Sequence, residues 1–444
     1  MTNLPVLDNF LKNYQSFLMD IPLKNTVIVY IHHALQTSLN VISSLLMLGA
    51  NPSNIYVVGK SYSENKEVVA KIKKMGINYQ DSSSQKGYGK YKASFIYDIE
   101  QLWKKVQCGL TNNIQDVLIL DHGGHAISNI PRSIKENYSI IGIEKTTAGT
   151  MKYNKDNKPN IPIINVAGCA AKRWLESPLI AEAIAKKSTD LIDSISEDKK
   201  CAVIGFGAIG QAMSSFLKCK GKQVLIYDKQ YPFDSNKKLE NIISEADYIF
   251  GCTGTDITAG IVENIMSSDM DKVFLSCSSE DKEFLSLLVS VTKDKLYKQE
   301  HLLDDIEYLT PNNSIITIMK GGFPVNFDSS GESVPAQDIQ LTRTLVVAGV
   351  LQALKMKSTY KTLPSELYSL NSYIQKQIVD LWCQDKNNEE SILSLFNSTI
   401  WISEQSVGLN VPLDINSVSE ENKNEWDSLK TSDGKFNDHT YLIA

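Results

Sequence analysis

Three glycines spaced as Gly-x-Gly-x-x-Gly constrain this chain more than any other feature of its sequence. Gly205, Gly207 and Gly210 directly follow the β-rich run AVI and open the amphipathic segment AIGQAMSSFLKC. In a strand–turn–helix unit the first glycine permits a tight turn, the second lets the backbone approach a phosphate, and the third lets helix and strand pack closely. The free N–H groups at the helix start attract anions, so Ala208 and Ile209 join the predicted phosphate site.

An acidic residue lies where such a unit needs one to recognise a ribose. The next predicted strand, QVLIY, ends in Asp228, 18 residues after Gly210. A carboxylate there accepts hydrogen bonds from the ribose hydroxyls and repels a 2′-phosphate, which favours NAD over NADP. Thr253 and Gly254, in CTGT after a later strand, are predicted to flank the cofactor. The alternative is a domain of this kind that has lost its ligand.

Short apolar runs alternate with helical patterns through the first half of the chain. The predicted strands are TVIVYI (26–31), NIYVVG (54–59), DVLILD (116–121) and PIINVAG (162–168), and helical segments such as 38–50 lie between them. This alternation is typical of a parallel sheet with helices on both faces. A second α/β unit begins at residue 201. We therefore predict an α/β fold of two doubly wound Rossmann-like domains with a C-terminal helical tail.

A charged break, SEDKK (196–200), separates the two units. We predict a substrate domain over residues 1–187, completed by a helix-rich return over 335–395. The NAD-binding domain is predicted over 188–334, and residues 396–444 form the tail. The active site is expected between the two domains, at the carboxyl ends of both sheets.

Composition excludes several other classes of protein. The net charge of −6 provides no electrostatic basis for binding nucleic acid or an anionic membrane. No apolar run reaches the roughly 18 residues that span a bilayer, and the N-terminal segment lacks the pattern of a signal peptide. The seven cysteines are scattered and the six histidines lack metal-ligand spacing. We expect a cytoplasmic protein that holds no metal and acts on a small molecule.

Several motifs occur in an order that resembles the adenosylhomocysteinases, NAD-dependent enzymes that cleave S-adenosylhomocysteine. Their INVxxxxxK appears at 164–172, their DDGGD as DHGGH at 121–125, and their EETTTG as EKTTAG at 144–149. Their Val-Asn appears at 325–326, and their Asp-Gly…Asp-His-Tyr tail as Asp-Gly…Asp-His within 433–439, with a tyrosine at 441. The resemblance extends over nearly the whole chain and implies the same fold and cofactor.

The resemblance also implies roles for individual residues. His33 matches the family's histidine near the scissile bond, and Lys172 matches the lysine that takes the alcohol proton. Glu176 replaces an aspartate and keeps its charge. Thr146, Thr147 and Asn326 match positions that contact the cofactor. The family's tail closes the NAD site of a neighbouring subunit, so a homodimer or homotetramer is expected.

Other positions depart from the family pattern. His122 stands for the second aspartate of DDGGD, and Lys145 stands for a ribose-binding glutamate. Further departures are Leu35, Thr37, Ser279 and the segment GESVP at 331–335. A lysine donates hydrogen bonds and carries positive charge where a carboxylate accepts them and is negative. The pocket is therefore predicted to prefer an anionic or carbonyl-bearing group, with both Lys145 and His122 in the site.

The leading prediction is an adenosylhomocysteinase-like enzyme that uses NAD to oxidise a secondary alcohol, transiently or as the net reaction. Its substrate would be a small polar or anionic molecule other than S-adenosylhomocysteine. Two alternatives stay open. One is a divergent adenosylhomocysteinase that still hydrolyses S-adenosylhomocysteine, and the other is a catalytically silent homologue that binds NAD and regulates a partner.

Overall fold

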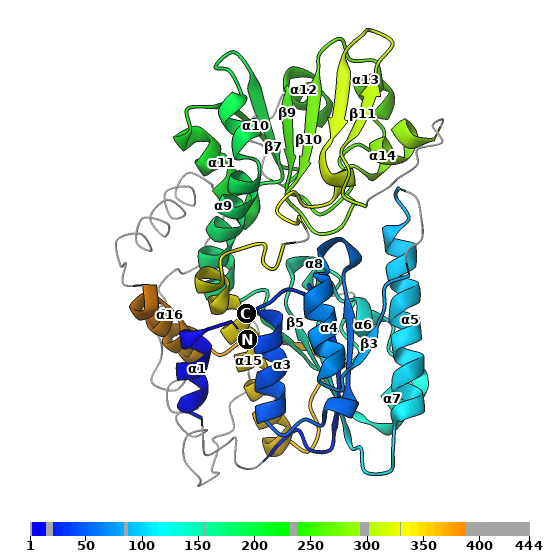
Figure 1. Ribbon diagram of the computed structural model, residues 1–444, viewed down its shortest axis with the longest axis vertical. Coiled ribbons are helices and arrows are strands. Elements are labelled where there is room, and N and C mark those ends of the chain that lie inside the picture. Colours follow the sequence, from blue (N-terminus) through cyan, green and yellow to red (C-terminus); the bar gives the residue numbers. More distant parts are fainter. Residues whose placement is uncertain are drawn as a thin grey trace.

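The computed structural model describes residues 2–14, 21–83, 88–153, 157–230, 238–293, 302–328 and 330–386. These residues form two α/β lobes that lie end to end along the long axis of the molecule (Figure 1). The predicted tail, 396–444, lies outside the described residues. Within the described ranges, no helix combines the length and the apolar character needed to cross a membrane.

The first lobe is built on a parallel sheet of seven strands in the order β13-β6-β5-β4-β1-β2-β3. Its strands are β1 (Thr26–His32), β2 (Ile55–Gly59), β3 (Asn78–Gln80), β4 (Asp116–Asp121), β5 (Ser139–Glu144), β6 (Ile163–Asn165) and β13 (Leu367–Ser369). β1 is buried along its whole length. Alternate β1 side chains enter different cores: Ile28 and Tyr30 join one, and Val27, Val29 and Ile31 join the other. This period of two is what a strand covered on both faces requires.

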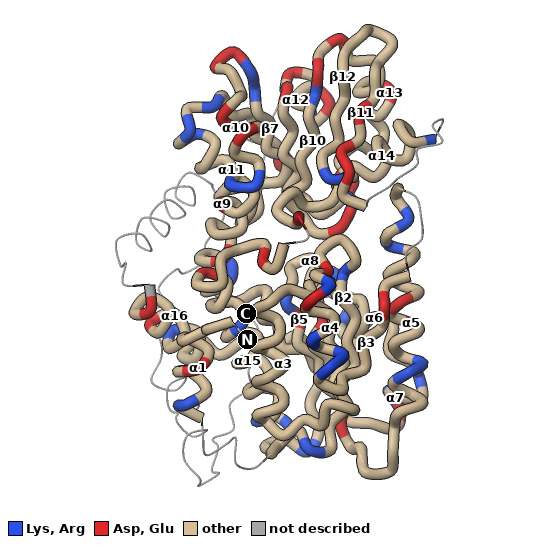
Figure 2. Tube along the Cα trace, in the orientation of Figure 1, with Lys and Arg blue, Asp and Glu red and all other residues tan. Residues whose placement is uncertain are grey.

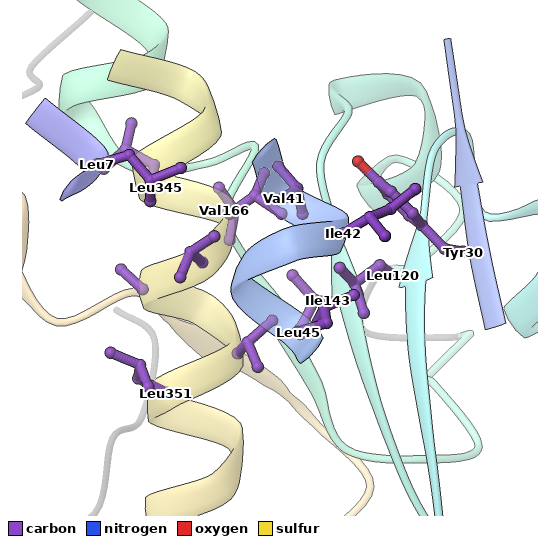
Figure 3. Packing of buried hydrophobic residues seen from close by; sticks show 14 of the residues in the cluster. Leu7, Tyr30, Val41, Ile42, Leu45, Leu120, Ile143, Val166, Leu345 and Leu351 are labelled. Carbon is purple, nitrogen blue, oxygen red and sulfur yellow. The ribbon is translucent and has the colours of Figure 1, made fainter. Parts of the chain in front are cut away.

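Helices cover both faces of this sheet. One face carries α1 (Pro5–Lys12), α3 (Ser38–Met47), α4 (Lys66–Lys74), α15 (Ala336–Thr359) and α16 (Ser372–Lys386), and the other carries α5 (Tyr91–Gly109), α6 (His125–Ser128) and α7 (Arg132–Asn137). Figure 3 shows α15 and α3 packing their apolar side chains against the sheet. Because α15 and β13 come from the C-terminal part of the chain, the chain returns to this lobe after building the other.

The second lobe holds a sheet of six strands in the order β11-β12-β10-β9-β7-β8. Its strands are β7 (Lys200–Ile204), β8 (Gln223–Tyr227), β9 (Tyr248–Gly251), β10 (Lys272–Ser276), β11 (Ile306–Leu309) and β12 (Ile315–Ile318), and only β11 is antiparallel to its neighbour. The helices α9 (Ser177–Lys187), α10 (Thr189–Ser194) and α11 (Ala208–Cys219) cover one face, and α12 (Leu239–Glu245), α13 (Val262–Met266) and α14 (Leu285–Thr292) cover the other.

The predicted fold class is confirmed, with two mostly parallel sheets that helices cover on both faces. The strands of the first sheet lie within 26–165 and 367–369, and those of the second within 200–318. The boundaries predicted at 187/188 and 334/335 fall between these sets and remain predictions. Figure 2 shows both signs of charge scattered over the two lobes.

Candidate functional site at the junction of the two lobes

The three motif glycines lie in the turn from β7 to α11, and each meets different surroundings. Gly205 has a φ of +94°, and a Cβ there would lie 2.9 Å from the main-chain carbon of Cys252. A Cβ on Gly210 would lie 1.8 Å from the carbonyl oxygen of Gly205, so only glycine lets the helix approach the turn. Among the residues that the structure describes, none other than its chain neighbours has an atom within 4 Å of a Cβ on Gly207. The middle glycine thus borders open space, as a phosphate-binding turn requires.

The start of α11 offers main-chain donors, because no side chain of the described residues caps it. Gly207 is exposed there, and Ala208 and Ile209 are half-buried. Asp228, at the end of β8, accepts hydrogen bonds from the main-chain N–H groups of Phe206 (2.6 Å) and Gln230 (2.7 Å). Its carboxylate therefore lies against the glycine turn, where it also fixes the turn's shape.

Glu283 organises the neighbouring loop after β9 and was not among the predicted residues. Its fully buried carboxylate accepts from the N–H of Thr253 (2.7 Å), the hydroxyl of Thr253 (2.8 Å) and the N–H of Gly254 (2.7 Å). The hydroxyl of Ser278 donates a further bond of 2.5 Å. Burial raises the pKa of Glu283, and these donors oppose the rise. The predicted cofactor residues Thr253 and Gly254 are thus held in place by an acid 30 residues away.

A second buried glutamate, Glu144, holds a loop in place in the first lobe. Glu144 ends β5 and accepts from the N–H groups of Gly123 (3.1 Å) and Gly124 (2.8 Å), in the loop after β4. It also accepts from the N–H and the hydroxyl of Thr146, each at 2.7 Å. Thr146 caps the short helix α8 (Thr147–Thr150) by accepting from Gly149 (3.0 Å). Thr146 therefore has a structural task, whereas Thr147 is exposed.

His33 and His122 meet at the carboxyl ends of β1 and β4. Their Nε2 atoms lie 3.2 Å apart, and Nδ1 of His33 lies 2.5 Å from the hydroxyl of Ser63. The ring of Phe327, from the chain after the second sheet, stacks on His33 with centroids 4.5 Å apart. Burial, followed by the charge of Lys60, lowers the pKa of both histidines well below the ordinary value. Both rings are therefore neutral at neutral pH.

Lys172 and Glu176 form an ion pair across one turn of a π-helical segment, Lys172–Glu176, that precedes α9. Both side chains are mostly buried, at 16% and 12% exposed. The second carboxylate oxygen of Glu176 accepts from the hydroxyl of Thr342 on α15 at 2.8 Å. The charge of Lys172 also contributes to the low pKa of His122, so the ion pair and the histidine pair belong to one neighbourhood.

Lys145 is more deeply buried than a direct substrate contact suggests. It is 5% exposed, its Nζ donates to the carbonyl of Ile31 at 2.7 Å, and it lies 4.5 Å from the ring centroid of Tyr30. Burial, followed by the charge of Arg343, lowers its pKa well below the ordinary value. In this arrangement Lys145 supports the end of β1, and its contact with substrate remains a prediction.

A buried charged cluster joins the two lobes, and sequence reasoning missed it. Glu280, in the loop after β10, lies 3.2 Å from Nζ of Lys60 at the end of β2 and 2.7 Å from Nε2 of His125 in α6. The Lys60 side chain is 0% exposed and that of Glu280 is 7% exposed. Lys60, His125 and other nearby donors hold the pKa of Glu280 far below its usual range despite burial. The carboxyl ends of the two sheets therefore face each other, and the active site is expected between them.

Two further expectations concern Asn326 and metals. Asn326 is 4% exposed and follows Val325, whose N–H donates to the carbonyl of Ser276 at the end of β10 (3.2 Å). It thus lies in the second lobe next to Phe327, at the junction. Among the residues that the structure describes, no group of three or more histidine, cysteine or acidic side chains is arranged to hold a metal ion.

No family model matches the chain. The chain is 27% identical over 358 residues to an uncharacterized protein of Mycobacterium tuberculosis, found in two strains. The aligned region covers 80% of this chain and 68% of the mycobacterial protein.

Solved structures with similar folds are more distant. One is the NAD-complexed form of a D-isomer specific 2-hydroxyacid dehydrogenase from Lactobacillus delbrueckii ssp. bulgaricus (11% identity, TM-score 0.36, 76% of this chain and 99% of that one). Another is an NAD+-bound 3-phosphoglycerate dehydrogenase from Entamoeba histolytica (13% identity, TM-score 0.37, 77% of this chain and 98% of that one). Similarity at this level identifies neither a family nor a substrate. None of these likenesses specifically supports the adenosylhomocysteinase resemblance, which remains a prediction.

Proposed function

We propose that the chain is an NAD-dependent enzyme that oxidises a secondary alcohol of a small polar or anionic molecule, transiently or as its net reaction. One observation carries the proposal. Within the described part of the chain, the turn from β7 to α11 leaves open space at Gly207, while close contacts exclude side chains at Gly205 and Gly210. The residues present fit a dinucleotide: N–H groups at the start of α11 would hold its phosphates, and Asp228 would hold the adenosine ribose. Thr147, Thr253, Gly254 and Asn326 are the further contacts that we propose.

The first lobe supplies groups suited to a polar substrate. Burial lowers the pKa of His122 most, and the charges of Lys60, Lys145 and Lys172 lower it further. Lys60 is paired with Glu280, and Lys172 with Glu176. Two neutral imidazoles beside these cations favour a ligand with carbonyl, hydroxyl or carboxylate oxygens.

Bound NAD would supply the acceptor for the hydride that leaves the alcohol carbon. The alcohol must also lose its hydroxyl proton. We propose that the ammonium of Lys172 first releases a proton to solvent, and that the neutral amine then takes the alcohol proton. The carboxylate of Glu176 would then stabilise the ammonium that forms, and Thr342 would keep that carboxylate oriented. His122 would hold a substrate oxygen at the other side of the site, and His33 would position the His122 ring.

The adenosylhomocysteinase resemblance supports a transient oxidation, and the substitutions at His122 and Lys145 argue for a different substrate. A homodimer or homotetramer is part of this proposal, and light scattering coupled to size-exclusion chromatography tests it. Hydrolysis of S-adenosylhomocysteine is the competing activity. If the protein releases homocysteine from S-adenosylhomocysteine in the presence of NAD, this hydrolysis replaces the oxidation of another alcohol as the proposed activity.

The decisive experiment follows the nicotinamide absorbance of the NAD-loaded protein while small secondary alcohols are added. An oxidised alcohol should reduce bound NAD, and Lys172→Ala should abolish the reduction while leaving NAD affinity unchanged. Lys186→Ala is the matched control, because Lys186 also pairs with a glutamate four residues away, on the exposed face of α9. If Lys172→Ala reduces NAD as fast as Lys186→Ala does, the proposed role of Lys172 is wrong. Failure to bind NAD would refute the function as a whole.

A further inference from the structure

Both ring nitrogens of His33 are occupied by the protein itself. Nδ1 lies 2.5 Å from Oγ of Ser63, and Nε2 lies 3.2 Å from Nε2 of His122. Phe327 stacks on the ring with an interplanar angle of 22° and blocks one face. A group with no free nitrogen cannot itself exchange a proton with a substrate while this arrangement lasts.

One ring nitrogen of His122 is hydrogen-bonded within the protein. Its Nε2 contacts His33, and its main-chain N–H donates to the carboxylate of Asp121 at 2.7 Å. In the part of the chain that the structure describes, no hydrogen bond reaches Nδ1 of His122, and this atom is not among the buried polar atoms without a partner. The outward-facing nitrogen of the histidine pair is therefore Nδ1 of His122.

The 3.2 Å contact between two neutral imidazoles holds one proton, because one nitrogen must donate and the other accept. The position of that proton depends on Ser63. When the Ser63 hydroxyl donates to the carbonyl of Lys60, at 3.0 Å, it accepts from Nδ1–H of His33. Nε2 of His33 then accepts from Nε2–H of His122, and Nδ1 of His122 carries a lone pair.

The opposite arrangement is equally complete. The Lys60 carbonyl already accepts the N–H of Ser63 at 2.8 Å, so the hydroxyl of Ser63 is free to donate to Nδ1 of His33. Nε2–H of His33 then donates to His122, and Nδ1 of His122 carries a proton. The rotation of one hydroxyl thus decides whether the outward nitrogen of His122 donates or accepts.

From this geometry we propose that Ser63, His33 and His122 form a proton relay in which Nδ1 of His122 is the atom that contacts the substrate. His33 and Ser63 are positioning residues that set the protonation of that atom. A proton that enters at Nδ1 of His122 releases the Nε2 proton of His122 to Nε2 of His33, so charge moves away from the substrate without movement of either ring. This assignment rests on the proposed alcohol oxidation for its catalytic meaning, but the hydrogen-bond pattern stands by itself.

Nuclear magnetic resonance of protein labelled with 15N at histidine tests the pattern without substrate or cofactor, since protonated and bare ring nitrogens differ in shift. His33→Asn and His122→Asn assign the signals by their loss. We expect one ring proton on each histidine at neutral pH. Ser63→Ala should shift the signals of both rings, and Ser63→Thr, which keeps a hydroxyl, should restore them. Ser44→Ala is the matched control, because Ser44 is a buried serine that donates to the carbonyl of Asn40 on α3 (2.9 Å).

Two results would overturn the relay. One is a Ser63→Ala spectrum in which the His122 signals match those of the unaltered protein and of Ser44→Ala. The other is a doubly protonated His33 or His122 at neutral pH. In the activity arm, His122→Asn should slow reduction of bound NAD by at least tenfold, and Ser63→Ala should shift its pH profile, with NAD affinity unchanged in both. If no alcohol reduces bound NAD in the unaltered protein, the proposed function fails while the ring-proton pattern still decides the relay.

Discussion

Replacement of Glu280 by glutamine tests whether the buried charged cluster holds the two lobes together. Nζ of Lys60 lies 3.2 Å from the Glu280 carboxylate, and the Lys60 side chain is 0% exposed. At that distance the attraction amounts to about 5 kcal/mol for an effective dielectric constant near 20. Glutamine keeps the size of the side chain but removes the charge, so Lys60 becomes a buried cation without its counter-ion. Removing one partner of such a pair costs about 3–5 kcal/mol, a large share of a typical stability of roughly 5–15 kcal/mol.

We expect Glu280→Gln to lower the free energy of unfolding by about 3 kcal/mol or more, measured by urea titration, or to open the lobes, measured by small-angle X-ray scattering. The folded protein holds the pKa of Glu280 below its usual range. The difference in unfolding free energy between Glu280→Gln and the unaltered protein should therefore persist from neutral pH down to about 4.3 and shrink at lower pH. Glu263→Gln, on the exposed face of α13, is the control. Adding Lys60→Met to Glu280→Gln should recover part of the loss, since no charge remains to be compensated. A loss below about 1 kcal/mol with an unchanged scattering profile would refute the reasoning.

The remaining predictions concern the cofactor turn and one buried acid. Gly207→Ala should fold normally and lose NAD affinity. Gly210→Ala should also lower thermal stability, because the new Cβ would lie 1.8 Å from a carbonyl oxygen. Calorimetry of NAD binding and of thermal unfolding separates these two effects, and equal unfolding temperatures for the two variants would refute the packing role of Gly210. Asp228→Ala should weaken NAD binding by at least tenfold in titration calorimetry, and unchanged affinity would contradict the ribose contact. Burial raises the pKa of Asp281 to about 6, so its folded form keeps a proton that the unfolded chain loses, and stability falls as pH rises from about 4 to about 6. Asp281→Asn should remove that pH dependence. Between pH 4 and pH 7 its free energy of unfolding should rise by about 2 kcal/mol relative to that of the unaltered protein, as measured by urea titration at both pH values.

The strands could be predicted from the sequence because their signal is local. The run DVLILD was predicted as a strand over 116–121, which is also the extent of β4, and TVIVYI fell one residue short of β1. Buried parallel strands are continuous apolar runs, so their position does not depend on distant partners. The short strands β3 and β13 were not predicted. Each has three residues, and β13 joins the first sheet only because α15 returns the chain to it.

The candidate site was only partly predictable, because much of it depends on contacts between distant segments. The glycine turn and Asp228 follow a local pattern with fixed spacing, and the structure places them together. Glu144 belongs to the motif EKTTAG, but its contact with the loop of Gly124 spans 20 residues of sequence, and that of Glu283 with Thr253 spans 30, so no local pattern indicates these contacts. Lys145 was predicted to lie in the site from a substitution at one aligned position, but its burial beside Tyr30 arises only in the folded chain.

One short segment, 278–283, connects the loop of Thr253 and Gly254 to the first lobe. At one end Glu283 holds the loop of Thr253 and Gly254, and three residues earlier Glu280 binds Lys60 and His125 in the other lobe. Glu280 has a φ of +71°, a conformation that costs a residue with a side chain about 1 kcal/mol or more. The contacts to Lys60 and His125 offset that strain only when the lobes meet. A series of contacts across the junction therefore connects the loop of Thr253 and Gly254 with the histidine pair, since Ser63, which bonds to His33, donates to the carbonyl of Lys60.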